Sequence, residues 1–238
     1  MAYIGTLATA TESVSTGATT LTVPRGVPAG RTLAIGCVWD SAAAALPALG
    51  SVTDSRGNTY ALDAGVNSGT TVSCALLRGR VVNGLDQGDT ITIALDTGVV
   101  RARWAVVCEE HDAIAANPFD KSSVNAAGPA TSLATGQTDP TSEPHELVIA
   151  VFGFGQDRAV TPPQGWQAAP LVQSNAGSSD RAVQMIHRYV SSAGPQEGTL
   201  GIDPAGVYAA AIGTYRLDEQ TPGPSVGEWG HVPAGAAS

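Results

Sequence analysis

Residues 51–62, SVTDSRGNTYAL, gather four polar side chains around one glycine, between an apolar-alternating segment and a tyrosine. Such a gathering is typical of a reactive site or of a chain reversal. VTPPQGW at 160–166 keeps the Val-Thr, the glycine and the aromatic residue, but has prolines where the first stretch has Asp54 and Ser55. A reactive site would need the polar groups to persist. We therefore interpret DSRGN as a hairpin, with Gly57 at positive φ and Asp54 or Ser55 bonded to the backbone two residues on.

The two turns belong to an internal repeat that covers most of the chain. ATTLT at 18 matches ATSLA at 130, RTLAIGCVW at 31 matches HELVIAVFG at 145, CALLRGRVVNGLDQGDTITI at 74 matches VQMIHRYVSSAGPQEGTLGI at 183, and RWAVVCEEHD at 103 matches YAAAIGTYRLD at 208. We therefore expect a β-sandwich domain at residues 1–218, with halves at about 1–112 and 113–218, and an extended Pro/Gly-rich C-terminal arm at 219–238.

The composition favours an all-β fold, because Gly and Pro are abundant and only 14% of the residues are charged. Only DSAAAALPAL at 40–49 has a helix-friendly composition, and Pro47 breaks it. We predict a jelly-roll-like double-sheet β-sandwich with the internal pseudo-repeat, and two small sandwiches in tandem stay open as the alternative. The expected strands are 3–9, 19–24, 31–39, 58–64, 70–82, 89–96, 99–110, 145–155, 166–173, 180–191, 197–203 and 206–217. The connector at 117–144 carries a strand pattern of its own.

The charge balance bears on the possible partners. The chain has 21 acidic and 12 basic residues, a net charge of -9. Proteins that bind nucleic acids neutralise phosphates with clustered Lys and Arg, so we expect no nucleic-acid partner. The N-terminal MAYIGTLATATESVS lacks the pattern of a secretory signal, and the longest apolar runs have only the length of a strand. We expect a protein made in the cytoplasm, with no membrane partner.

Three cysteines, Cys37, Cys74 and Cys108, lie inside apolar strand-like runs. An odd count without short spacing disfavours both a disulfide framework and a zinc site. We expect free, buried thiols that pack as small hydrophobic side chains.

The strongest candidate for chemistry is EEHD at 109–112, which could hold a hard cation or a general acid and base. Alternate residues of a strand face opposite sides, so Glu109 and His111 should point one way and Glu110 and Asp112 the other. They do not converge without a residue from elsewhere, and the matching TYRLD supplies no such cluster. We expect a solvated strand end, no catalytic residue, no cofactor and no metal ion.

Other routes to catalysis find little support. The nucleophile elbow, the phosphate-cradling glycine loop and H-E-x-x-H are absent from the sequence. A glycosidase needs two carboxyl groups about 5–9 Å apart, and most candidates here adjoin turn residues. Trp39, Trp104 and Trp166 fall within expected strands, where core packing weakens a glycan-binding interpretation. The candidate acids are Asp40, Asp54, Asp63, Asp86, Asp89, Glu109 and Glu110.

After Asp218 the sequence EQTPGPSVGEWGHVPAGAAS alternates Pro and Gly, which forbids regular structure. Trp229 is the natural anchor of this arm, because aromatic side chains in pockets dominate interface energetics. We expect Trp229, His231, Val232 and Pro233 to bind a partner chain. Folding of the arm back onto its own sandwich stays open as the alternative.

VTDSRGNTY, GRVVNGLDQGDTITIAL, HELVIAVFGFG and VTPPQGW together resemble a diffuse group of sandwich domains that tailed phages of actinobacteria encode as minor capsid, decoration or minor tail proteins. The resemblance spans about residues 15–217 and rests on turn and strand patterns without catalytic content. It implies a non-enzymatic virion protein, most simply a capsid decoration or minor capsid protein. Such a protein would bind and stabilise the outer surface of the major capsid shell.

The resemblance also implies partners, namely the major capsid protein or other virion proteins and further copies of this chain. Trimers are common among such proteins, and a net negative charge keeps the chains soluble. Two other functions stay open: a minor tail protein or carbohydrate-binding module that recognises host surface glycans, and a hydrolase that works from EEHD.

Overall fold

The computed structural model describes residues 3–40, 49–69, 71–95, 102–155, 158–175, 177 and 180–218. The elements in this part of the chain are antiparallel β-strands, which confirms the prediction of an all-β sandwich. A search of the described residues finds no helix long and apolar enough to cross a membrane. Most of the helix-friendly stretch at 40–49 and the whole predicted arm, with Trp229, His231, Val232 and Pro233, lie outside the described residues.

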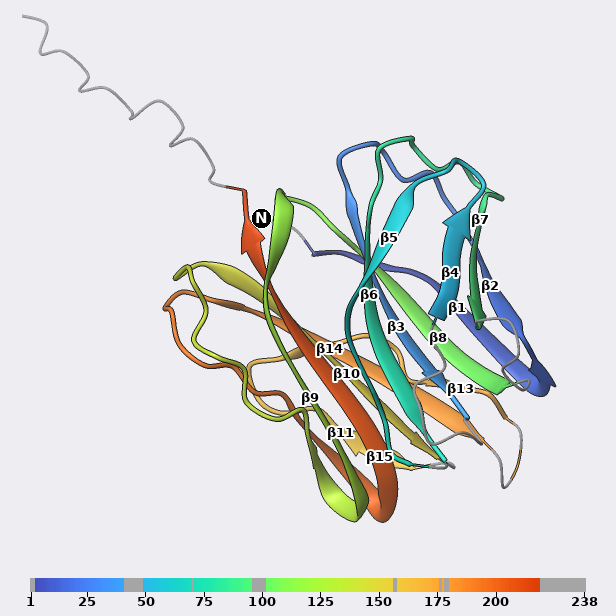
Figure 1. Cartoon of the computed structure of the whole chain (residues 1–238), viewed down its shortest axis with the longest axis vertical. Coiled ribbons are helices and arrows are strands. Elements are labelled where there is room, and N and C mark those ends of the chain that lie inside the picture. Colours follow the sequence, from blue (N-terminus) through green and yellow to red (C-terminus); the bar gives the residue numbers. More distant parts are fainter. Residues whose placement is uncertain are drawn as a thin grey trace, which may run out of the picture.

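The first half builds one large and one small sheet that share a core (Figure 1). The large sheet has the strand order β1-β8-β3-β6-β5, and the small sheet has the order β2-β7-β4. The strands are β1 (Tyr3–Thr16), β2 (Ala18–Thr22), β3 (Thr32–Trp39), β4 (Leu49–Asp54), β5 (Thr59–Asn67), β6 (Ser73–Arg80), β7 (Thr90–Leu95) and β8 (Ala102–His111).

The second half repeats this plan with two long strands, which Figure 1 shows side by side as β9 and β15. Its large sheet has the order β9-β15-β10-β14-β12, with β13 also on β14, and β15 continues beyond it to pair with β11. The strands are β9 (Ile114–Ala134), β10 (Glu146–Gly155), β11 (Ala159–Thr161), β12 (Gln167–Ala168), β13 (Val172–Gln173), β14 (Arg181–Val190) and β15 (Thr199–Leu217). Only Asp112 and Ala113 separate β8 from β9.

The pairing shows that the sequence repeat is structural. In one half β3 lies between β6 and β8, and in the other β10 lies between β14 and β15. The matched turns also occupy equivalent places, because Val52 pairs with Ile93 as Val160 pairs with Ile202. Gly57 has φ 75°, as predicted, and Gly165, its counterpart, has φ 82°.

The DSRGN segment is not a hairpin, however. β4 pairs with β7 of the small sheet, whereas β5 pairs with β6 of the large sheet. The turn therefore carries the chain across the core from one sheet to the other. The local signal, glycine and polar residues between two strands, is the same for both kinds of turn, so it could not reveal the strand partners.

Two of the sequence alignments between the repeats are shifted by one residue from the equivalence that the structure shows. RTLAIGCVW and HELVIAVFG match Leu33 with Leu147, yet Leu33 packs in the core of its own half and Leu147 packs between the halves. RWAVVCEEHD and YAAAIGTYRLD likewise match Trp104 with Ala209, which face different cores. These strands are buried on both faces, so their apolar residues do not alternate with polar ones that would fix the register.

Three hydrophobic cores lie between successive layers of the molecule. The first outer core fills the sandwich of the first half and contains Trp39 and Trp104, with ring centroids 5.5 Å apart. The second outer core fills the other half around Phe152 and Phe154. The middle core joins the two large sheets face to face through residues such as Val151. The two halves therefore pack back to back.

The buried thiols were predicted correctly, since Cys37, Cys74 and Cys108 are free and buried. Burial raises the pKa of each of these thiols, which keeps them protonated and unreactive. The same packing of Trp39 and Trp104 within a core removes them from any glycan-binding surface.

Candidate functional site

β8 ends at His111, and the EEHD side chains alternate as predicted, but only Asp112, just after the strand, is partly exposed. Glu109, Glu110 and His111 are 0%, 1% and 1% exposed. The reason is position: β8 lies between β1 and β3, and the second half covers the face that carries Glu109 and His111. The expectation of a solvated strand end is therefore wrong for Glu109, Glu110 and His111.

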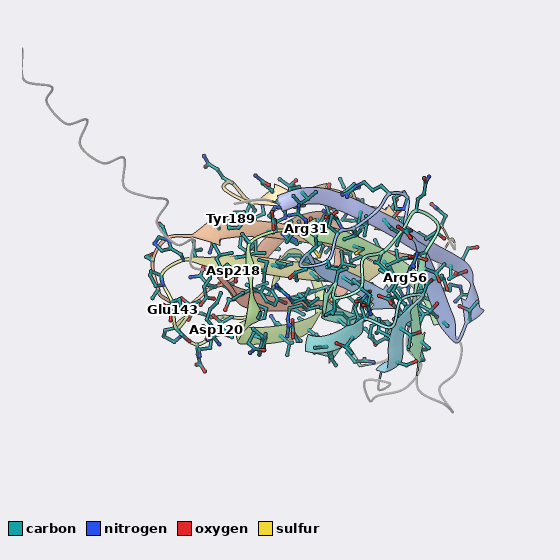
Figure 2. The ribbon with its side chains drawn as sticks, turned by 90° about the horizontal axis from the view of Figure 1, so that it is seen from above. Arg31, Arg56, Asp120, Glu143, Tyr189 and Asp218 are labelled. Carbon is teal, nitrogen blue, oxygen red and sulfur yellow. The ribbon has the colours of Figure 1, made fainter. Side chains whose placement is uncertain are left out.

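Glu110 and Asp112 meet arginines on the opposite face of β8. Arg25 forms an ion pair with Glu110, and Arg31 contacts both Glu110, at 3.4 Å, and Asp112. Figure 2 shows Arg31 between Tyr189 and Arg56 along the length of the molecule. These pairs fix the end of β8 to the segment that leads into β3.

Glu109 and His111 are buried together with His187, beside the half-buried Tyr3 and the exposed Gln167. We call this set the histidine cluster: Tyr3, Glu109, His111, Gln167 and His187. Glu109 Oε2 lies 3.2 Å from His111 Nε2 and 3.2 Å from His187 Nδ1. His187 Nε2 lies 2.9 Å from Gln167 Oε1, and the Tyr3 ring packs 4.3 Å from the His187 ring. The convergence that EEHD alone could not achieve is thus completed by His187 of β14, from the other half.

The cluster places one carboxyl group between two imidazoles. Burial by itself would raise the pKa of Glu109, but the contacts with His111 and His187 outweigh it and hold that pKa below its ordinary value. Within the described part of the chain, Glu109 Oε1, His111 Nδ1 and His187 Nδ1 have no hydrogen-bond partner of good geometry, although His187 Nδ1 lies at ion-pair distance from Glu109. The cluster therefore favours the charged form of Glu109 and is incompletely satisfied.

A second polar set lies at the place that the repeat makes equivalent, with Asp63 and Arg78 from the first half and the aromatic residues from the second. We call it the arginine cluster: Asp63, Arg78, Phe119 and Tyr215. Tyr3 pairs with His111 across β1 and β8, and Phe119 pairs with Tyr215 across β9 and β15. Arg78 donates two hydrogen bonds to Asp63, at 3.0 and 3.2 Å. Burial raises the pKa of Tyr215, and the neighbouring Asp63 raises it further.

A small cavity of about 10 Å³, with room for about one water molecule, lies between the two clusters. His111 borders it from the histidine cluster, and Arg78 and Tyr215 border it from the arginine cluster. Ile114, Leu147 and Ile149 complete much of its wall. Such a space is too small for an organic substrate.

The other candidate acids hold the strands and turns together. Asp54 accepts hydrogen bonds from the backbone of Arg56, from Asn58 and from Tyr60. Arg56 forms ion pairs with both Asp86 and Asp89. In Figure 2, Arg56 lies toward the end opposite Asp218.

Asp40 and Asp63 also bind neighbouring strands of the chain. Asp40 forms an ion pair with Arg103 at 2.9 Å, which fixes the end of β3 to the start of β8. Asp63 is committed to Arg78, as described. The candidate acids are thus bound to partners from the chain itself and do not form an open pair of carboxyl groups of the glycosidase kind.

Sequence reasoning also missed one contact between carboxyl groups, Asp120 of β9 with Glu146 of β10. Asp120 accepts a hydrogen bond from the Ser142 backbone at 2.6 Å, and Glu146 is 0% exposed. Burial raises the pKa of Glu146, and the neighbouring Asp120 adds to the increase. This pair fastens the turn before β10 to β9.

The described residues contain no group of three or more His, Cys, Asp or Glu side chains that could hold a metal ion. A buried acid and imidazole can pass a proton between them, but the cavity that the described residues form beside His111 is too small to admit a substrate. Its geometry suits a link between the halves better than a catalytic centre. No protein-family model, curated protein or solved structure matches this chain.

Proposed function

We propose that the chain is a non-enzymatic structural protein of a phage virion, a capsid decoration or minor capsid protein that binds the outer surface of the major capsid shell. The proposal rests on one observation: the polar side chains that could serve catalysis form structural contacts within the chain. The carboxyl groups that could serve a hydrolase are bound to arginines, amides or imidazoles that hold strands and turns together.

The surface and the sequence resemblance support the same function. Part of the positive charge is committed within the described residues, since Arg25, Arg31, Arg56, Arg78 and Arg103 all form ion pairs. The net charge of -9 then keeps many copies soluble before they assemble. The turn and strand motifs resemble phage capsid and tail proteins, which points to a virion as the place of assembly.

Reconstitution on particles tests the proposal. Full-length protein is added to virions assembled without it, and electron microscopy measures its occupancy and location. We expect saturable binding to the shell, which deletion of residues 219–238 or the Trp229→Ala substitution abolishes without changing the unfolding temperature. Ser225→Ala in the same arm is the matched control and should bind normally.

Four outcomes would count against this proposal. Binding to the tail alone would favour a minor tail protein, and saturable binding on a glycan array would favour a carbohydrate-binding module. Normal occupancy of the truncated protein would remove the arm from the proposal. Hydrolysis that Glu109→Gln abolishes in a folded protein would revive an enzyme.

A further inference from the structure

The two halves contact each other through the same surface of each. β3 is equivalent to β10, β6 to β14 and β8 to β15, because each group of three forms the centre of a large sheet in the same order. Across the middle core β8 contacts β14 while its counterpart β15 contacts β6, and β3 contacts β14 while β10 contacts β6. Each of these contacts occurs twice with the halves exchanged, which is the arrangement of an isologous, two-fold interface.

Residues of β3 and β10 place the two-fold axis between these strands. Counted from the matched pairs of the histidine and arginine clusters, the strand register makes Gly36 equivalent to Val151 and Val38 equivalent to Gly153. A Cβ on Gly36 would lie 3.1 Å from Val151, and a Cβ on Gly153 would lie 2.7 Å from Val38. Both contacts therefore join a residue to its own counterpart, which is the position of residues beside a two-fold axis.

A hinge of two residues closes this interface within one chain. Asp112 and Ala113 lie between β8 and β9, and Ala113 has φ 54°, in the left-handed region that is unfavourable for a residue with a Cβ. The Asp112 carboxylate accepts a hydrogen bond from the Ala113 backbone at 2.8 Å and forms an ion pair with Arg31. The Ala113 carbonyl accepts a hydrogen bond from the Asp218 backbone at 2.9 Å. These contacts hold a backbone conformation that alanine resists.

We propose that two copies of this chain exchange halves, so that the first half of each copy packs through the middle core against the second half of the other. The exchanged dimer regenerates the contacts of the middle core and of both clusters, because each half presents the same face to its partner. Only Asp112 and Ala113 need a different backbone conformation. Extending them removes the positive φ of Ala113, and short hinges under strain favour this kind of exchange.

The concentration of the protein decides between the two forms. The closed monomer loses no translational freedom, so it should dominate in dilute solution. The exchanged dimer relaxes two hinges and should accumulate when unfolded chains refold close to one another. The exchange rests on the contact between the halves and is independent of the virion function proposed above.

Refolding of the full chain at two concentrations tests the exchange. Protein unfolded in urea is refolded at about 0.3 mM and at about 1 µM, and size-exclusion chromatography with light scattering measures the dimer fraction. We expect at least about tenfold more dimer at the higher concentration. A chain that stays monomeric at the higher concentration would overturn the proposal.

A disulfide across the middle core distinguishes exchange from side-by-side association. The double substitution Val38→Cys and Gly153→Cys puts two thiols at positions where a Cβ on residue 153 meets the side chain of residue 38. The disulfide joins two chains in an exchanged dimer, and it lies within one chain in a monomer or a side-by-side dimer. We expect covalent dimers on a non-reducing gel after refolding at the higher concentration, and none from Val38→Cys alone. Dimers with intrachain disulfides only would refute the exchange.

Ala113→Gly assigns the exchange to the hinge. Glycine accepts a positive φ, so this substitution relieves the closed monomer. Because each dimer relaxes two hinges, we expect the association constant to fall by at least about tenfold. Asn175→Gly is the matched control, since Asn175 also has φ 54° but lies between β13 and β14, and it should leave the constant unchanged. Equal association of the two variants would contradict the proposal, and this comparison stays decisive if the cysteine variant does not fold.

Discussion

Glycines at two equivalent turns show how one residue can set the path of the chain between sheets. Gly57 and Gly165 have φ of 75° and 82°, and a Cβ added to either would meet no atom within 4 Å. An alanine at these positions would therefore be disfavoured by its backbone conformation alone. Substitutions at these two positions would therefore measure the free-energy cost of a positive φ alone, without a clash between the new Cβ and its neighbours.

We expect Gly57→Ala and Gly165→Ala each to lower the free energy of unfolding by about 1–2 kcal/mol, because the left-handed region is unfavourable for a residue with a Cβ. Urea denaturation measures the change. Gly17→Ala is the control, since its Cβ also has open space and its φ is not in the left-handed region, and it should cost less than about 0.5 kcal/mol. Equal costs at all three sites would contradict the account.

Asn58 makes the first of these turns rigid. Its side chain donates to Asp54 Oδ2 and to the Asn83 carbonyl, and its Oδ1 accepts from the backbone of Val82 and Asn83. The residue is 6% exposed. It thus joins the turn after β4 to the turn after β6.

Asn58→Ala should lower the free energy of unfolding by about 2–3 kcal/mol, since it leaves several partly buried groups without partners. Asn83→Ala removes only the exposed hydrogen bond to the Arg56 carbonyl and should cost less than about 1 kcal/mol. Thermal and urea unfolding of the pair measure the difference. A cost at Asn58 no larger than at Asn83 would show that the turn does not depend on this amide.

At the scale of elements, β3 and β10 approach each other across the middle core because glycine and valine interlock. A Cβ on Gly153 of β10 would lie 2.7 and 2.9 Å from the Val38 methyl groups of β3. A Cβ on Gly36 of β3 would lie 3.1 and 3.2 Å from the Val151 methyl groups of β10. Each glycine makes room for a valine of the facing strand.

Gly153→Ala should therefore lower the free energy of unfolding by about 1–3 kcal/mol through overpacking. Adding Val38→Ala should cost less in the Gly153→Ala background than in the wild type, by about 1 kcal/mol, because the smaller side chain admits the new methyl group. A double-mutant cycle in urea measures this coupling. Additive costs would indicate that the two strands do not interlock. Gly128→Ala, with no atom within 4 Å of its Cβ, is the control.

The elements also show how far the sequence could predict the structure. Turn residues and alternating apolar positions located most strands, and the repeat revealed two similar halves. β4 is not among the expected strands, because its pattern also fits the approach to a turn, and β9 is expected only as a connector with a strand pattern. The repeat alignment matches residues of β3 and β8 with residues of β10 and β15 that face a different core. Strands that are buried on both sides have no alternation of apolar and polar residues to fix the alignment.

The candidate site was predicted less well than the fold. The alternation of Glu109 and His111 against Glu110 and Asp112 followed from strand geometry and is confirmed. Their burial depends on the other half of the chain, and His187 lies 76 residues beyond His111 in a strand with no unusual motif. No local pattern indicates that a histidine of one half will meet a carboxyl group of the other.

At the scale of the whole molecule, the middle core should make the two halves unfold together. Each half has a core of its own, yet residues such as Leu76, Val107 and Val151 become buried only through the contact between the halves. Either half alone would expose this apolar face to water. A single cooperative transition follows.

Fluorescence of a Trp166→Phe and Trp229→Phe variant reports on Trp39 and Trp104 of the first half, whereas far-ultraviolet circular dichroism reports on all strands. We expect the two signals to give the same urea midpoint. Separate midpoints would mean that the halves unfold independently. The Trp166→Phe change itself should cost little, since that ring is only partly buried.

The short connection between β8 and β9 has one more consequence. Asp112 and Ala113 alone join the two halves, so each half meets its neighbour at the high effective concentration of an intramolecular reaction. Two separate chains would need a high affinity to associate in dilute solution. In a symmetric dimer the two clusters would also have to be identical. The tether removes both requirements. It leaves the two clusters free to diverge, so that one holds a guanidinium pair while the other holds imidazoles.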